Sequence, residues 1–193
     1  MKKVGILALQ GDFDAHTKAV ERAGATAVEV RSAHDLDALD GLIIPGGEST
    51  TMLKLLQEEK LMEPLRQFGQ RRPIFGTCAG AILLANEVSS PSQESLGLID
   101  IGVERNAYGR QVDSRIASIV PEPDFQARAG SGDMEAVFIR APIIRRVGSA
   151  ARVLARYQGD PVLVEDGRHM VATFHPELSN DPRVHELFLQ KLP

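Results

Sequence analysis

The chain is poor in cysteine, in aromatic residues and in long hydrophobic runs. Its 193 residues include one cysteine, no tryptophan and 5% aromatic residues. A single cysteine cannot close an internal disulfide, so we expect a protein of the reducing cytoplasm. No apolar stretch is long enough to cross a bilayer. The apolar run at residues 4–9 is too short for a secretion signal, and Gln10 and Gly11 interrupt it.

Charge of neither sign dominates. The chain has 22 Lys and Arg residues against 26 Asp and Glu residues, a formal net charge of −4 and a pI near 5.8. This balance argues against a nucleic-acid or anionic-membrane partner. The length suits one medium domain with a full core. Because no repeat or linker interrupts the sequence, we expect residues 1–193 to form a single domain.

The first half of the chain alternates short apolar runs with helical segments. Strands are predicted at residues 4–9, 26–31, 41–45 and 73–75, and helices at residues 14–23, 51–58 and 64–69. This alternation with short links predicts an α/β fold, an open and mostly parallel sheet flanked by helices. Catalytic groups in such sheets gather beyond the carboxyl ends of the strands.

The second half is richer in short strands. Strands are predicted at residues 98–105, 116–120, 134–139, 152–157, 161–165 and 169–174, with a helix at residues 184–192. Asp166 and Gly167 form a strong hairpin signal. Residues 89–95 and 121–133, the latter rich in proline, glycine and charge, are predicted to be exposed loops.

The lone cysteine lies in the sequence Gly-Thr-Cys-Ala-Gly at residues 76–80, between an apolar strand and residues that favour a helix. This is the layout of a nucleophile elbow, in which flanking glycines let strand and helix approach closely. The positive end of the helix dipole favours a thiolate at Cys78. A lone cysteine is more often an inert buried residue, so the hypothesis needs a base and an oxyanion site elsewhere.

His175 is the candidate base because it follows an apolar strand, whose carboxyl end lies where the elbow is expected. If the backbone stays extended, His175 and Glu177 point to the same side, and Pro176 biases the residue before it towards that form. Glu177 would then orient the imidazole, whose other nitrogen faces Cys78. The alternative is a histidine bonded to nearby backbone.

The other four histidines have simpler explanations. His16 is expected to be a surface or contact residue of the first helix, and His34 lies in a charged loop. His185 lies on the final helix, and His169 is expected to be exposed in its hairpin. No pair has close metal-ligand spacing, so we expect no metal site.

An oxyanion in a tetrahedral intermediate is best held by backbone N–H groups, because they are fixed dipoles. The N–H of Ala79, directly after the cysteine, is one donor by elbow geometry. Gly46 or Gly47 is the candidate for the second donor. The alternative for these two glycines is an ordinary flexible turn.

Three segments together resemble the class I, or triad-type, glutamine amidotransferases, which have a flavodoxin-like fold. They are Pro-Gly-Gly-Glu-Ser-Thr-Thr at residues 45–51, the elbow, and Phe-His-Pro-Glu-Leu at residues 174–178. More narrowly, the chain is similar to the glutaminase subunits of pyridoxal 5′-phosphate synthase, the PdxT family. That similarity rests on residues 9–11, 103–106, 109–114 and 138–142.

The resemblance implies that Cys78 attacks the side-chain amide carbon of L-glutamine. His175 would assist the thiol and protonate the departing ammonia, while Glu177 orients His175. A glutamyl thioester would form and be hydrolysed to glutamate. No cofactor is implied, and the resemblance implies both the hydrolase and the lyase class.

The resemblance also assigns residues to substrate binding. These are Gly47, Glu48 and Ser49 in the glutamine-binding loop, Arg105 near the substrate α-carboxylate, and Ile139 and Arg140 at its polar end. The candidate oxyanion donors Gly46 and Ala79 are counted with them. A zwitterionic substrate needs charged or backbone partners at both ends. The alternative for both arginines is a solvated or ion-paired strand residue.

The implied partner is a separate synthase subunit, a (β/α)₈ barrel of the PdxS type, which receives the ammonia within a large hetero-oligomer. In the family, docking completes the oxyanion site by reorienting the Gly46–Gly47 peptide, so we expect the free chain to be sluggish. Three alternatives remain at this point: a glutaminase subunit serving histidine or purine synthesis, a cysteine-elbow chaperone or deglycase, and a non-enzymatic binding module.

Overall fold

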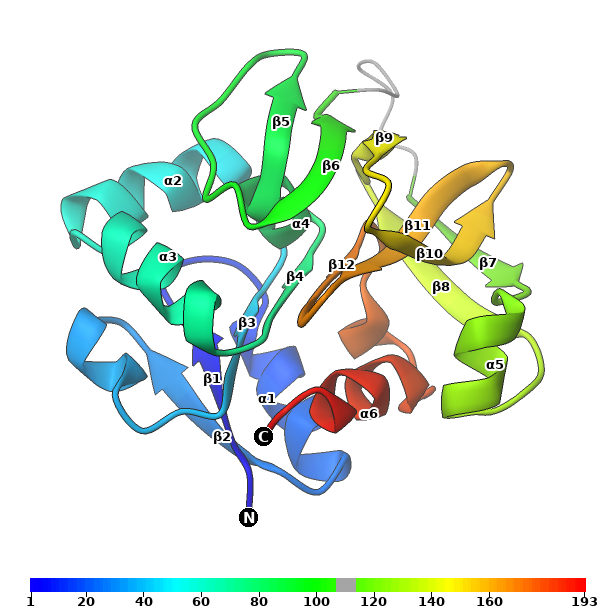
Figure 1. Cartoon of the computed structure of the whole chain (residues 1–193), viewed down its shortest axis with the longest axis horizontal. Coiled ribbons are helices and arrows are strands. Elements are labelled where there is room, and N and C mark those ends of the chain that lie inside the picture. Colours follow the sequence, from blue (N-terminus) through cyan, green and yellow to red (C-terminus); the bar gives the residue numbers. More distant parts are fainter. Residues whose placement is uncertain (107–113) are drawn as a thin grey trace.

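A seven-stranded sheet forms the centre of the protein (Figure 1). The computed structural model describes residues 1–106 and 114–193. Within them the strand order is β10-β11-β12-β4-β3-β1-β2. The parallel strands are β1 (Lys3–Leu7), β2 (Thr26–Val30), β3 (Gly41–Ile44), β4 (Ile74–Thr77) and β12 (His169–Ala172), and the antiparallel ones are β10 (Arg152–Tyr157) and β11 (Asp160–Asp166). The predicted α/β fold with a mostly parallel sheet is confirmed.

Helices cover both faces of this sheet. One face is packed by α2 (Ser49–Glu58), α3 (Met62–Arg71) and α4 (Ala79–Leu84), and the other by α1 (Phe13–Arg22), α5 (Pro123–Ala129) and α6 (Arg183–Gln190). A short 3₁₀ helix, η1 (Ala33–Leu36), follows β2. The predicted helices therefore exist, with ends that differ by a few residues.

Strand side chains alternate between the two hydrophobic clusters. In β3, Leu42 and Ile44 pack on the side of α2 and α3, whereas Ile43 packs on the side of α1 and α6. All three side chains are fully buried. A strand buried on both faces reads as a continuous apolar run, which is why the central strands are visible in the sequence.

Two smaller sheets, formed mostly by the second half of the chain, lie beside the central sheet. One contains β5 (Ala85–Ser89), β6 (Ile99–Glu104) and β9 (Ile143–Val147), and the other is the hairpin of β7 (Ser114–Ile119) and β8 (Met134–Ile139). The additional strands and hairpins expected in this half are present. Strands β5 and β9 were not predicted, because their exposed polar residues and arginines mask the strand pattern.

The prediction of an exposed loop at residues 121–133 is wrong. Residues Pro123–Ala129 form α5, with Pro123 in its first turn, a position where proline is favoured. Phe125 is fully buried in the cluster that contains α6. One buried aromatic side chain anchors this short helix, and the surrounding proline, glycine and charge concealed it.

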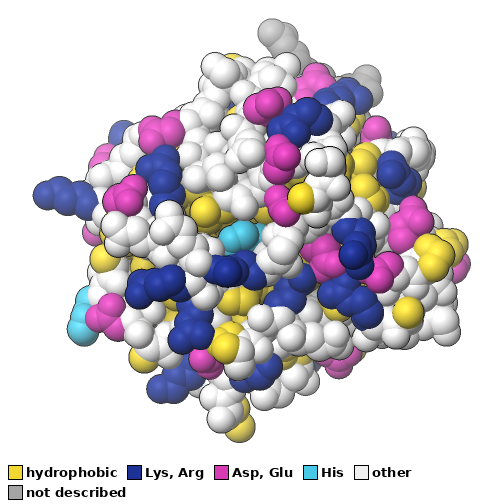
Figure 2. Space-filling view, in the orientation of Figure 1, with side chains coloured by type: hydrophobic (Ala, Val, Ile, Leu, Met, Phe, Trp, Pro, Cys, Tyr) yellow, Lys and Arg dark blue, Asp and Glu magenta, His cyan; other side chains and the backbone are white. Residues whose placement is uncertain are grey.

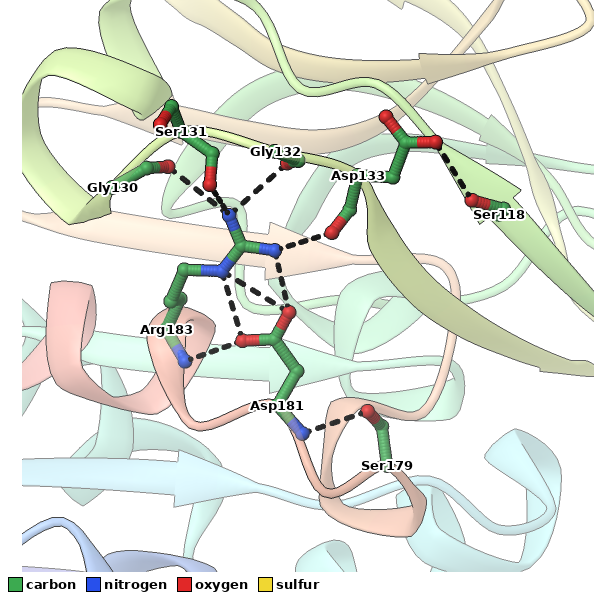
Figure 3. Close-up of polar contacts among 8 residues, drawn as sticks. All are labelled: Ser118, Gly130, Ser131, Gly132, Asp133, Ser179, Asp181 and Arg183. Carbon is green, nitrogen blue, oxygen red and sulfur yellow. Dashed lines mark hydrogen bonds and ion pairs between the residues drawn. The ribbon is translucent and has the colours of Figure 1, made fainter.

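Arg183 fixes the turn after α5 to the start of α6 (Figure 3). Its guanidinium donates hydrogen bonds to the backbone carbonyl oxygens of residues 130–133 and to both carboxylate oxygens of Asp181. The backbone N–H of Asp181 in turn donates to the hydroxyl of Ser179. These bonds attach the segment that follows β12 to the turn between α5 and β8.

The surface carries mixed charges. On the face shown in Figure 2, Lys and Arg side chains alternate with Asp and Glu side chains, and hydrophobic side chains appear in small groups. Among the described helices, none is long and apolar enough to cross a membrane.

The buried side chain of α5 provides a stability test of the corrected fold. We expect Phe125→Ala to lower the free energy of unfolding by about 3–5 kcal/mol, because it leaves a cavity under α5. The matched control is Ile116→Ala, since Ile116 is 69% exposed, and a change within about 0.5 kcal/mol is expected there. Urea unfolding measures both, and equal effects would contradict the packing described for α5.

Candidate active site

Cys78 lies at a sharp turn between β4 and α4, with φ 50° and ψ −107°. The backbone can make this turn only with glycine on both sides. A Cβ at Gly76 would lie 2.5 Å from the backbone of Gly80, and a Cβ at Gly80 would lie 2.1 Å from the carbonyl oxygen of Ile44. Such a strained conformation in a non-glycine residue is typical of functional sites. The predicted elbow geometry is present.

The neighbouring strands β4 and β12 bring Cys78 close to His175. Thr77 pairs with Ala172 in the parallel ladder, and the N–H of Cys78 donates to the carbonyl oxygen of Ala172 at 2.8 Å. A Cβ placed at Gly46 would lie 2.5 Å from the His175 ring and 3.2 Å from Cβ of Cys78. Both side chains therefore lie against Gly46, close enough for the sulfur to influence the charge of the ring.

Glu177 contacts His175 as predicted, but by a different backbone route. Nδ1 of His175 lies 2.6 Å from Oε1 of Glu177. The chain does not stay extended: Pro176–Leu178 form a 3₁₀ helix, η2, and the N–H of Leu178 donates to the carbonyl oxygen of His175. Pro176 occupies the first helical position, where its fixed φ suits a helix start. The expectation of a period-two strand was therefore wrong.

Opposing effects act on the charge of His175. Burial disfavours the imidazolium, but the hydrogen bonds and charges of Cys78 and Glu177 outweigh it and raise the pKa of His175 from 6.5 to about 10. The ring therefore holds its proton at neutral pH. A protonated imidazole between the cysteine sulfur and a carboxylate can orient the sulfur and deliver a proton to a leaving group.

The structure corrects the predictions for two other histidines. His16 is fully buried against Thr77 and His185 rather than at the surface. His169 is also buried, and its Nδ1 accepts a hydrogen bond from the N–H of Ile74. The partners of each buried ring are distant in sequence, so no local pattern indicates these contacts. His34 is exposed, but it lies in the 3₁₀ helix η1 rather than in the predicted loop.

A cavity of about 440 Å³ opens at Cys78. Its lining is drawn from the predicted binding segments and from the helix start: Gly47, Glu48, Ser49, Cys78, Ala79, Ile82, Arg105, Asn106 and Arg140. Gly46 packs against the cysteine and His175, and the carbonyl oxygen of Ile139 accepts from the thiol at 3.8 Å. The structure thus brings the predicted site residues together.

Several polar side chains of the cavity already have partners. Both carboxylate oxygens of Glu48 accept from backbone N–H groups at the start of α2. Burial opposes the charged form, but these bonds hold the pKa of Glu48 below its usual value. Arg105 donates to the hydroxyl of Thr50 at 2.6 Å, and Ser49 donates to Gln93. The helix cap therefore fixes the loop that forms one wall.

The glycine loop beside the cysteine is packed against Gln10 and Gly11. A Cβ at Gly47 would lie 2.3 Å from Oε1 of Gln10, and a Cβ at Gly11 would lie 1.8 Å from the carbonyl oxygen of Gly46. The N–H of Glu48 donates to Oε1 of Gln10. The sequence analysis used Gln10 as a break in the first apolar run and as a marker of resemblance, and it missed this packing role.

Two expectations from the sequence, the resemblance at residues 109–114 and the absence of a metal site, can be compared only with the described part of the chain. Residues 109–113 of the segment 109–114 lie outside the described residues. In the described part of the chain, no group of three or more His, Cys, Asp or Glu side chains could hold a metal ion.

Comparison with known proteins decides the family. The model of the SNO glutamine amidotransferase family matches residues 6–193. The chain belongs to this family. SNO glutamine amidotransferase membership agrees with the geometry at Cys78, and it excludes the reading of the chain as an unrelated binding module.

Named relatives of this SNO family chain are close in sequence and in structure. It is 65% identical over 192 residues to the pyridoxal 5′-phosphate synthase subunit PdxT of Solibacter usitatus, covering 100% of both chains. It is 53% identical to the PdxT of Koribacter versatilis, covering 97% of this chain and 94% of that one. A crystal structure titled as a glutamine amidotransferase is 46% identical, with a TM-score of 0.88 and 97% coverage of each chain. None of these findings supports the lyase class expected from the sequence.

The coupling between Cys78 and His175 can be tested directly. We expect Cys78→Ala to lower the pKa of His175 from about 10 towards 6.5, because the variant loses the hydrogen bond and charge of the sulfur. An NMR titration of the imidazole measures the shift, with Ser118→Ala as a control remote from the cavity. An unchanged titration would contradict the contact.

The same pKa shift predicts a pH dependence of stability. Because the pKa of His175 is raised above its ordinary value of 6.5, its protonation stabilises the fold fully below pH 6.5. That contribution is lost as the pH rises towards 10. The wild-type advantage over Cys78→Ala, measured by urea unfolding, should therefore shrink across this window.

Proposed function

We propose that this chain, residues 1–193 acting as one domain, hydrolyses L-glutamine to L-glutamate and ammonia. It does so as the glutaminase subunit of a pyridoxal 5′-phosphate synthase. The observation that carries the proposal is the place of His175, bonded to Glu177 and packed with Cys78 against Gly46 beside the cavity. The full-length similarity to named PdxT subunits supports the identity of the synthase.

The first half of the reaction uses the imidazolium–thiolate pair. Sγ of Cys78 attacks the side-chain amide carbon of glutamine, forming a C–S bond and a tetrahedral oxyanion. The C–N bond then breaks, and the proton on His175 goes to the departing nitrogen, which leaves as ammonia. Glu177, accepting from Nδ1 at 2.6 Å, keeps the other ring nitrogen directed at the reacting atoms.

The second half returns the cysteine. Having given up its proton, His175 accepts one from a water molecule, whose oxygen attacks the carbonyl carbon of the glutamyl thioester. The C–S bond breaks, glutamate leaves, and the thiolate and imidazolium are restored. The same histidine serves first as acid and then as base, as in other triads.

Backbone dipoles stabilise the oxyanion in both halves. Ala79 is the first residue of α4, so its N–H has no acceptor inside the helix. The second donor comes from the Gly46–Gly47 peptide, which packs beside Cys78. Its glycines let this peptide reorient, and we infer that docking of the synthase fixes the productive orientation.

Charged groups around the cavity hold the two ends of glutamine. Arg105 lies in the lining next to the α2 cap and faces the substrate α-carboxylate. Arg140, with φ 47°, and the neighbouring Ile139 bound the opposite wall at the polar end of the substrate. The backbone and side chains of Gly47, Glu48 and Ser49 complete the binding loop.

The partner of this glutaminase is a synthase subunit, and we infer that it is a (β/α)₈ barrel in a large hetero-oligomer. Ammonia passes across the closed interface, which keeps it from protonation in bulk water. The complex works in the cytoplasm, where a reducing environment keeps the catalytic thiol free.

Glutamate release with and without the synthase tests the proposal. We expect little activity from the free chain, a strong increase on adding a pyridoxal 5′-phosphate synthase barrel subunit, and a loss of at least about 10³-fold in Cys78→Ala. Acceptor enzymes of histidine or purine synthesis serve as controls. Activation by one of these instead would favour that alternative, and full activity in the Cys78 variant would exclude the thioester.

Arg105 tests how the substrate is held. We expect Arg105→Met to raise KM for glutamine roughly 10- to 100-fold with kcat nearly unchanged, because it removes a charged hydrogen bond worth about 1.5–3 kcal/mol. Arg156→Met is the matched control, since Arg156 lies on β10 and pairs with Glu122. An unchanged KM would remove Arg105 from the binding site.

A further inference from the structure

Two buried histidines lie directly behind the candidate triad. His16, from α1, is fully buried, and His185, from α6, is 1% exposed. Nδ1 of His16 lies 3.0 Å from Nε2 of His185, and Nε2 of His16 lies 3.0 Å from the hydroxyl of Thr77. Polar rings are buried in this way when each nitrogen has a specific partner. The reaction described above uses neither of them.

Glu177 has one oxygen engaged and one without a hydrogen bond. Oε1 contacts His175, whereas Oε2 is buried and has no hydrogen-bond partner among the described residues. Nε2 of His16 lies 3.3 Å from Oε2 of Glu177, within ion-pair distance. A buried carboxylate oxygen without a donor destabilises the fold, so the position of His16 beside this oxygen is significant.

The charge of Glu177 decides which tautomer His16 adopts. If Nδ1 of His16 carried the proton, the lone pair on Nε2 would face a carboxylate oxygen 3.3 Å away, which is repulsive. If Nε2 carries the proton, Oε2 of Glu177 at 3.3 Å and the hydroxyl of Thr77 at 3.0 Å are the two oxygens within its reach. Nδ1 then accepts from His185.

We propose that His16 is a positioning residue that holds Glu177 through its Nε2–H, with His185 fixing the His16 tautomer. The chain His185, His16, Glu177, His175 therefore extends the triad by two residues from α6 and α1. The proposal rests on the proposed function for its effect on rate. Its structural content, a neutral ring with a proton on Nε2, stands independently.

The surroundings keep His16 neutral, as this role requires. Burial, followed by the charges of His185 and His175, lowers the pKa of His16 well below 6.5, and burial and the charge of Arg22 lower that of His185 to about 4. A charged His16 would compete with His175 for the carboxylate. A cavity of about 340 Å³, lined by His185 and Arg22 among others, lies at the outer end of the chain of rings.

Two substitutions separate positioning from packing. His16→Leu removes the donor and keeps an apolar side chain of similar size, whereas His16→Gln restores an N–H donor. We expect His16→Leu, assayed in the complex with the synthase, to lower kcat roughly 10- to 100-fold, as loss of an outer partner of a functional histidine does, with KM unchanged. His16→Gln should recover most of kcat. His34→Leu, at an exposed position of η1, is the matched control.

Two measurements do not depend on glutamine turnover. We expect ¹⁵N NMR of the wild-type ring to show the proton of His16 on Nε2, and the pH profile of Cys78 alkylation by iodoacetamide to shift to higher pH in His16→Leu but not in His16→Gln. A wild-type proton on Nδ1, or equal loss in both variants, would overturn the proposal. Wild type without glutaminase activity but with these two signatures would instead refute the proposed function alone.

Discussion

The parallel pairing of β4 with β12 is the constraint on which the site depends. Because Thr77 is opposite Ala172, both strands end at the same edge of the sheet, and the residues that follow them must meet there. The N–H of Cys78 completes the ladder by donating to Ala172. Cys78 and His175, which are distant in sequence, are thereby held close together by backbone hydrogen bonds. These bonds do not depend on the side chains at the protein surface.

Two local devices refine this placement. The glycines flanking the cysteine allow a backbone conformation that lifts the sulfur towards the cavity, and the α2 cap made by Glu48 fixes the opposite wall. Burial then strengthens the interactions among Cys78, His175 and Glu177, because the local dielectric is low. The raised pKa of His175 is the electrostatic consequence of that geometry.

Much of this arrangement was accessible from the sequence, for identifiable reasons. Central strands such as β3 are buried on both faces and read as apolar runs, and the elbow is marked by glycines that no other residue could replace. The helix α5 was missed because one residue, Phe125, carries its packing. The roles of His16 and Gln10 depend on contacts between distant segments, which no local pattern encodes. The turn at Pro176 was misread because proline favours both an extended predecessor and a helix start.

The most direct test of the central claim is covalent labelling with a glutamine analogue that carries a chloromethyl ketone in place of the amide, followed by mass spectrometry. Because the chain contains one cysteine, peptide fragmentation distinguishes an adduct on sulfur from one on a histidine ring. The account predicts a single adduct on Cys78, prevented by excess glutamine and strongly slowed in His175→Ala. An adduct that forms at the same rate without His175, or that glutamine does not prevent, would contradict it.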